Sequence, residues 1–118
     1  MCSQKELQKI THRMAGAYQQ VYGDAIDQMI LYGSYARGNY NEFSDIDLAA
    51  IVHGDRITLQ KQLRQVWDVS TDLGLECDVI VSPTVIPYDE FEKYKTILPY
   101  YQNIDREGVR INEHKKFT

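Results

Sequence analysis

The sequence predicts a small fold that contains both helices and strands. Two long segments, around residues 7–21 and 59–74, repeat apolar residues every three or four positions, as amphipathic helices do. Three short segments carry apolar runs or alternations typical of strands: 28–32, 45–52 and 75–81. With 118 residues, the chain is predicted to form one domain over residues 1–118.

Charge and composition exclude several classes of protein. The net charge is −4 at pH 7, whereas nonspecific binding to long DNA or RNA needs a basic surface. No apolar run approaches the length of a transmembrane helix, and the first residues lack the layout of a secretory signal. We therefore expect a cytoplasmic protein that is not membrane-bound. Cys2 lies in a terminus and Cys77 in a predicted strand, so no disulfide is expected.

The two predicted helices carry clear apolar stripes. Ser3 is predicted to cap the first helix and Gly23 to end it. Its stripe is Leu7, Ile10, Met14, Tyr18 and Val21. The second helix is predicted to end near Gly74, and its stripe is Leu59, Leu63, Val66 and Trp67. Both stripes are expected to face the core.

A glycine turn separates the first two predicted strands. The first strand stops at Gly33, and a short helix is predicted from Ser34 through Arg37, with Gly38 breaking it. In the second strand side chains alternate between faces, so Asp45 and Asp47 share one face and the aliphatic residues share the other. The acids are therefore expected to face a site.

The third predicted strand adds another acid. Its alternation places Asp78 where it could meet Asp45 and Asp47 across neighbouring strands. Pro83 and Pro87 are taken to mark the exit from this strand. The remaining predicted elements are helices over 88–97 and 99–107, a helix end at Gly108, and a short strand or tail at 109–111.

Three carboxylates on two strands would form the oxygen-rich pocket that Mg²⁺ or Mn²⁺ prefers. Two such ions can clamp an in-line displacement at phosphorus, which indicates phosphoryl or nucleotidyl transfer. Zinc is not indicated, because the histidines are far apart in sequence and lack ligand spacing with a cysteine; they are His12, His53 and His114.

The turn at Gly33 supplies features of a phosphate site. A glycine before a helix lets backbone N–H groups approach phosphate oxygens, Ser34 offers a hydroxyl, and Arg37 offers a fork of donors. Taken singly, these residues also fit an ordinary turn or a solvated surface. Their combination, in this order with the acids, indicates a nucleotide and metal site.

Four tyrosines are candidates for contacts near this site. Tyr35 and Tyr40 flank it and could line a nucleotide pocket, while Tyr100 and Tyr101 could face a partner. The alternative for each is ordinary packing with the hydroxyl in water.

The residues Gly-Ser-Tyr-Ala-Arg-Gly at 33–38 and Ser-Asp-Ile-Asp-Leu at 44–48 resemble the signature of the DNA polymerase beta-like nucleotidyltransferases, in particular the minimal nucleotidyltransferases. The resemblance implies an α+β fold with a mixed β-sheet flanked by helices. It implies Asp45, Asp47 and Asp78 as metal ligands, with Asp78 also a general base. The residues implied to contact the triphosphate are Gly33, Ser34, Arg37 and Ser44. Residues 104–111 resemble the closing stretch of these proteins, but the aromatic residue expected near Ile111 is missing.

The resemblance also implies an activity and a partner. Members of the superfamily transfer a nucleoside monophosphate from an NTP to a hydroxyl and release pyrophosphate; Mg²⁺, as two ions, and ATP are expected here. Small members are commonly antitoxins of HEPN-type RNase toxins, and some add AMP to a tyrosine of the toxin. A HEPN-type toxin in a hetero-oligomer is therefore the implied partner. A catalytic domain without an acceptor-binding domain also needs an acceptor on another molecule.

Two alternatives remain open from the sequence. One is a nucleotidyltransferase acting on a small molecule such as an aminoglycoside, which would need dimerisation to build the acceptor pocket. The other is an antitoxin that acts by binding alone, with nucleotide as a structural ligand. No residue pattern identifies the base of the NTP.

Overall fold

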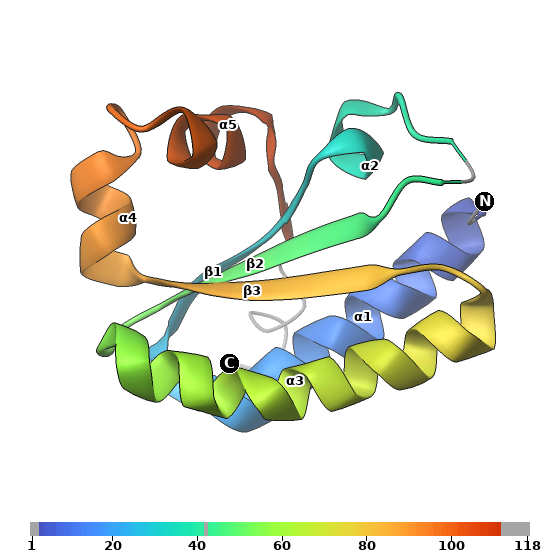
Figure 1. Cartoon of the computed structure of the whole chain (residues 1–118), viewed down its shortest axis with the longest axis horizontal. Helices are drawn as coiled ribbons and strands as arrows, with labels where there is room; N and C mark the ends of the chain where they lie inside the picture. The colour runs from blue at the N-terminus through green and yellow to red at the C-terminus, as the bar shows by residue number, and fades with distance from the viewer. Residues whose placement is uncertain (1–2, 42, 112–118) are drawn as a thin grey trace.

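The computed structural model describes residues 3–41 and 43–111, which form a four-stranded sheet with helices on both faces (Figure 1). The elements are α1 (Gln4–Tyr22), η1 (Gly23–Ala25), β1 (Ile26–Tyr32), α2 (Ser34–Arg37), β2 (Ile46–Val52), α3 (Arg56–Cys77), β3 (Val81–Pro87), α4 (Tyr88–Tyr94), α5 (Pro99–Glu107) and β4 (Val109–Ile111). Within the described ranges, no helix has the length and apolar character needed to cross a membrane.

The sheet is mixed, which confirms the predicted fold class. Its strand order is β3-β2-β1-β4. β1 is antiparallel to both β2 and β4, whereas β2 and β3 are parallel and are joined by the crossover helix α3. The parallel pair needs this long connection because its strands must run in the same direction.

The first helix forms as its sequence predicts. Ser3 and Glu6 exchange hydrogen bonds in a capping box: the Glu6 N–H donates to Ser3 Oγ at 3.1 Å, and the Ser3 N–H donates to Glu6 Oε1 at 3.2 Å. Gly23 ends the helix with a φ of 55°. The predicted stripe residues are buried except Val21, which is partly buried.

Two hydrophobic clusters cover the two faces of the sheet. The larger lies against α1 and α3, below the sheet in Figure 1, and includes Met29 and Leu48. The smaller lies against α4 and α5 and includes Ile30, Ala49 and Phe91. This division follows the strand alternation, because neighbouring residues of one strand point to opposite faces. Asp47 has the same parity as Ala49, so it belongs to the face of the smaller cluster.

The prediction of a strand over 75–81 is wrong. α3 continues through Gly74 to Cys77, Asp78 caps it in the left-handed conformation (φ 55°, ψ 52°), and β3 starts at Val81. The N–H groups of Asp78 and Val79 both donate to the Gly74 carbonyl. A Cβ on Gly74 would lie 2.6 Å from the Val79 carbonyl oxygen, so glycine here permits the chain to fold back after the helix.

The exit after the third strand also differs from the prediction. Pro83 and Pro87 lie within β3 and are buried. They are tolerated because β3 is an edge strand, where a residue without an N–H can turn its nitrogen away from the ladder. Trp67, predicted in the core stripe of the second helix, is instead 43% exposed.

Smaller differences concern element ends. β1 starts two residues before the predicted strand, β2 starts at Ile46 rather than Asp45, and α4 ends at Tyr94 rather than near 97. The predicted helix 99–107, its end at Gly108 and the short strand at 109–111 are confirmed. Cys77 is a free, partly buried thiol in α3. Cys2, His114 and the polar tail lie outside the described residues.

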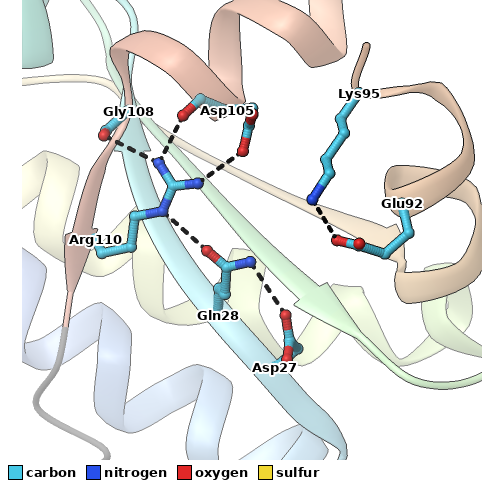
Figure 2. Close-up of polar contacts among 7 residues, drawn as sticks. All are labelled: Asp27, Gln28, Glu92, Lys95, Asp105, Gly108 and Arg110. Carbon is cyan, nitrogen blue, oxygen red and sulfur yellow. Dashed lines mark hydrogen bonds and ion pairs between the residues drawn. The ribbon is translucent and has the colours of Figure 1, made fainter.

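Arg110 links β4 to β1 and to α5 by side-chain hydrogen bonds. Figure 2 shows its guanidinium donating to Gln28 Oε1 (2.9 Å), the Asp105 carbonyl (2.9 Å), Asp105 Oδ1 (3.0 Å) and the Gly108 carbonyl (3.2 Å). One side chain thus ties β4 to β1 and to the end of α5. A Cβ on Gly108 would lie 2.2 Å from Ile30 Cγ2. Glycine is therefore required here because the backbone passes close to the Ile30 side chain, and not because of its backbone angles.

Candidate active site

The Gly33 turn is built against Asp47. Gly33 has a φ of 76°, and a Cβ added to it would lie 2.4 Å from Asp47 Oδ2. Its carbonyl accepts hydrogen bonds from the N–H groups of Ala36 and Arg37, both at 3.1 Å, which starts the short helix α2. Both the left-handed conformation and the close approach of the carboxylate therefore require glycine.

Asp47 lies in a row of three polar side chains across the sheet. Its partner on β1 is Tyr32 and its partner on β3 is Ser82. Directly paired residues point to the same face, so the carboxylate lies between two hydroxyl-bearing side chains. The Tyr32 and Tyr100 hydroxyls are 2.9 Å apart. Burial and this hydrogen bond raise the pKa of Tyr32 well above its usual range, and the charge of Asp47 adds to the shift.

Asp45 and Arg37 act on Asp47 with opposite signs. Burial raises the pKa of the Asp47 carboxyl, repulsion from Asp45 raises it further, and Arg37 lowers it. The structure thus brings together two predicted acids and the predicted arginine. The Asp45 and Asp47 carboxylates repel each other, and a divalent cation bound by both would offset this repulsion.

Arg37 is held at the rim of the site. Its Nη1 lies 3.4 Å from Glu107 Oε2, and both side chains are about two-fifths exposed. An exposed pair of this kind contributes only ~0–1 kcal/mol. Arg37 can therefore leave Glu107 for a phosphate at little cost. Ser34 is partly buried at the start of α2, directly after Gly33.

Asp78 lies at the C-terminal end of α3. It lines a hollow of about 430 Å³, which we call the Trp67 hollow, bounded by α3, the connection to β3 and the loop before β2. Ser44 and Asp45 line the same hollow, but Asp47 does not. Ser44 Oγ accepts the Asn41 N–H at 3.0 Å and so closes a turn in that loop.

The described side chains fit a metal ion only in part. Asp45 and Asp47 offer hard carboxylate oxygens, which suit Mg²⁺ when substrate phosphates and water complete its shell. Among the described residues, however, no three acids, histidines or cysteines are arranged to hold one ion. Asp78 caps α3 instead of standing in a strand, so its predicted position on a strand beside β2 is wrong, whereas its role as a metal ligand or general base stays a prediction.

The flanking tyrosines have different surroundings. Tyr35 is buried in the larger hydrophobic cluster and stacks on the partly buried Tyr40, which packs against that cluster, with ring centroids 4.2 Å apart. Tyr100 is 52% exposed, whereas the Tyr101 hydroxyl donates to Glu90. The first pair thus packs in the core rather than lining an open pocket. His12 and His53 are exposed, as expected for surface residues.

Three residues of the site were not singled out by the sequence. Tyr32 and Ser82 flank Asp47 because of strand register, and Glu107 reaches Arg37 across 70 positions. Register and long-range pairing leave no local pattern in the sequence. The alternation of Tyr32 with the buried Leu31 was the only available signal, and it does not identify the strand partner.

Known proteins resemble this chain in sequence. A family model described as "Nucleotidyltransferase domain" matches residues 14–111. Two curated proteins of Methanocaldococcus jannaschii, both named "Putative protein adenylyltransferase", are similar in sequence. One is 33% identical over 101 residues, which cover 86% of this chain and 93% of the relative. The other is 32% identical over 78 residues, 60% of this chain and 77% of the relative.

Two solved structures share the fold. One is a toxin–antitoxin with AMP-PNP, with a TM-score of 0.54 and 18% identity over 90% of this chain and 78% of that chain. Another is a mutant of the toxin–antitoxin MntA–HpeT, with a TM-score of 0.52 and 19% identity over 94% and 78% of the two chains. At these identities the likeness concerns the fold alone.

Proposed function

This chain belongs to the nucleotidyltransferase domain family, and we propose that it transfers AMP from ATP to a hydroxyl group of a partner protein. The observation that carries this proposal is the Gly33 turn packed against Asp47, with Asp45 and Arg37 in electrostatic reach. The relatives named as protein adenylyltransferases support AMP as the transferred group and protein as the acceptor.

The proposed partner is a HEPN-type RNase toxin, for which this chain would be the antitoxin in a cytoplasmic hetero-oligomer. The motif resemblance at residues 33–48 supports the HEPN type. The shared fold of the toxin–antitoxin structures agrees with this assignment. Modification of the toxin by this chain would then neutralise it.

The proposed roles follow from position. Asp45 and Asp47 would hold Mg²⁺, which when bound supplies positive charge at the transferred phosphate. Gly33 and Ser34 would lie along the triphosphate, and Ser44 would keep the loop before β2 folded close to it. Arg37 would exchange Glu107 for a phosphate oxygen. The acceptor oxygen forms a bond to the α-phosphorus, the bond from this phosphorus to the bridging oxygen breaks, and pyrophosphate leaves.

Asp78 is the proposed general base. It lines the Trp67 hollow together with Asp45, so a hydroxyl bound in that hollow would lie beside a carboxylate that can take its proton. As a third metal ligand, Asp78 would have to approach Asp47 by a movement of the connection between α3 and β3, since no three acids are grouped in the described structure.

The test is transfer of label from ATP carrying it at the α-phosphate. The protein is incubated with this ATP, Mg²⁺ and the product of the gene beside its own, and the protein and small-molecule fractions are counted separately. Label is expected on the neighbour. Asp47→Asn should lose transfer, whereas Asp24→Asn, which removes an exposed acid at the far end of β1, should keep it. Equal labelling by wild type and Asp47→Asn would contradict the proposal.

A protection assay in cells distinguishes neutralisation by catalysis from neutralisation by binding alone. Asp45→Asn combined with Asp47→Asn is expected to abolish protection from the toxin. Full protection by this double variant, with both proteins still forming a complex, would show that binding alone neutralises the toxin.

A further inference from the structure

Two tyrosine hydroxyls meet on the face of the sheet that carries Asp47. Tyr32 ends β1 and is the strand partner of Asp47, and the Asp47 carboxylate is close enough to act electrostatically on the Tyr32 hydroxyl. Tyr100 comes from the first turn of α5; its hydroxyl lies 2.9 Å from that of Tyr32, and the two rings stand edge to face. We call these two residues the tyrosine pair. It takes no part in the roles proposed for the acids, the glycine turn and Arg37.

The tyrosine pair is contiguous with the Gly33 turn. Tyr32 directly precedes Gly33, and a Cβ on Gly33 would lie 2.4 Å from Asp47 Oδ2. Figure 1 shows α5 over the face of the sheet opposite to α1 and α3. Because Tyr32 meets Tyr100 of α5, its hydroxyl extends away from the sheet, beyond the level of the shorter Asp47 side chain. The pair therefore stands where a ligand bound to the Asp47 carboxylate would lie.

The tyrosine pair has an unused hydrogen-bond donor. Each hydroxyl can donate one hydrogen bond and accept others, and the bond between the two oxygens uses only one of the two protons. Within the described part of the chain, neither hydroxyl has another hydrogen-bond partner. Tyr100 is 52% exposed and Tyr32 is partly buried, so Tyr100 is the member that a ligand can reach. The pair is thus an uncharged group that can both donate to a ligand and accept from it.

Helix α5 also borders the phosphate side of the site. Glu107, in its last turn, pairs with Arg37, the residue proposed to bind a phosphate. About two turns of helix separate Tyr100 from Glu107, a rise of about 10 Å, which is comparable with the extent of a ribose joined to its triphosphate. Anionic phosphates are better matched by Arg37 than by uncharged hydroxyls, whereas the neighbouring hydroxyls of a ribose both donate and accept, as the tyrosine pair does.

We propose that the tyrosine pair binds the vicinal 2′- and 3′-hydroxyls of the nucleotide's ribose, and that Tyr100 thereby makes the site selective for ribonucleotides. This inference rests on the proposed function, because it places the sugar of the ATP used in that reaction. A sugar without these hydroxyls would leave the donor of the pair without its partner. The alternative is that the two hydroxyls only hold α5 on β1 and do not touch the ligand.

The test combines removal of a tyrosine hydroxyl with removal of the sugar hydroxyls. Dissociation constants of ATP and 2′,3′-dideoxy-ATP are measured by calorimetry with Mg²⁺. Wild type should bind ATP about three- to tenfold more tightly than the dideoxy analogue, as expected for lost hydrogen bonds between uncharged groups. Tyr100→Phe should bind ATP as weakly as wild type binds the analogue, and its affinity for the analogue should equal that of wild type.

The matched control is Tyr88→Phe. Tyr88 packs against the same smaller hydrophobic cluster, but it follows Pro87, the strand partner of Val52 at the end of β2 away from Asp47. This variant should keep the wild-type preference for ATP. Each substitution removes one oxygen atom, and unfolding temperatures are measured to show that both variants keep the fold.

A purely structural role of Tyr100 predicts a different result. A displaced α5 would weaken ATP and the dideoxy analogue by the same factor, because the lost contact would not involve the sugar hydroxyls. Equal weakening of both nucleotides in Tyr100→Phe would therefore overturn the inference. Equal binding of both nucleotides by wild type would overturn it as well.

The outcomes separate this inference from the proposed function. If wild type labels the partner but binds ATP and the analogue equally, the ribose site is wrong and the function stands. If the preference for ATP depends on Tyr100 but no partner is labelled, the ribose site stands and the transfer to a protein is wrong. If wild type binds neither nucleotide, both are wrong.

Discussion

Gly33 is the residue on which the active site most depends. Gly33→Ala should lower the free energy of unfolding by about 1–3 kcal/mol, because the residue has a positive φ and its new Cβ would meet the Asp47 carboxylate. Transfer activity should be lost with it. Denaturant unfolding measures the first effect and label transfer the second.

The matched control is Gly16→Ala in α1. No atom lies within 4 Å of a Cβ at Gly16, and the residue is helical and exposed. Alanine should therefore stabilise the protein by about 0.5–1 kcal/mol. Equal effects of the two substitutions would show that the turn is not strained as described.

Asp47 should make stability depend on pH. Its pKa in the folded protein is raised from 3.8 by burial and by Asp45, so the folded state holds a proton that the unfolded state releases. Stability is therefore lost as pH rises from the ordinary carboxyl value through the folded value. Asp47→Asn removes this loss, so the variant should be more stable than wild type at pH 7.

The pH effect is measured as the difference in unfolding free energy between the two proteins from pH 3 to 8. The difference should disappear below the ordinary carboxyl pKa. Mg²⁺ should raise the melting temperature of wild type more than that of Asp47→Asn. A constant difference across this pH range would mean that the carboxylate is not destabilised by its surroundings.

At the scale of elements, the first half of the chain could be predicted and the third strand could not. Ser3, Gly23, Gly33 and Gly38 carry local signals that fix the ends of α1 and α2. The segment after Gly74 has the alternation of a strand, yet its first three residues finish α3. Gly74 is needed because the backbone passes close to Val79, and the left-handed cap falls on Asp78 rather than on a glycine. The end of α3 is therefore set by backbone geometry between residues 74 and 79, which the alternation of apolar and polar side chains does not reveal.

The strand β4 should depend on Arg110. Arg110→Ala removes donors to four acceptors and should cost about 1–3 kcal/mol. Faster amide hydrogen exchange is expected in β4. Arg106→Ala, on the exposed side of the same α5 junction, is the control and should change stability by less than about 0.5 kcal/mol. Unchanged hydrogen exchange in β4 of Arg110→Ala would show that the Arg110 hydrogen bonds do not stabilise this strand.

For the whole molecule, the two faces of the sheet should differ in stability. The cluster beneath α4 and α5 is the smaller, so this layer should open at a lower free energy than α1 and α3. Phe91→Ala should speed hydrogen exchange mainly in α4 and α5. Leu73→Ala, in the larger cluster, should lower the global free energy of unfolding by about 2–5 kcal/mol. Identical exchange patterns in both variants would mean that the molecule opens only as one unit.

The prolines of β3 limit how another chain can join this protein. β3 forms one edge of the sheet, and Pro83 and Pro87 have no N–H to offer on its outer side. The opposite edge, β4, has three residues within the described part of the chain. Both edges are therefore poor templates for an added strand from another chain. This arrangement disfavours fibre-like stacking of copies of the chain through the edges of their sheets.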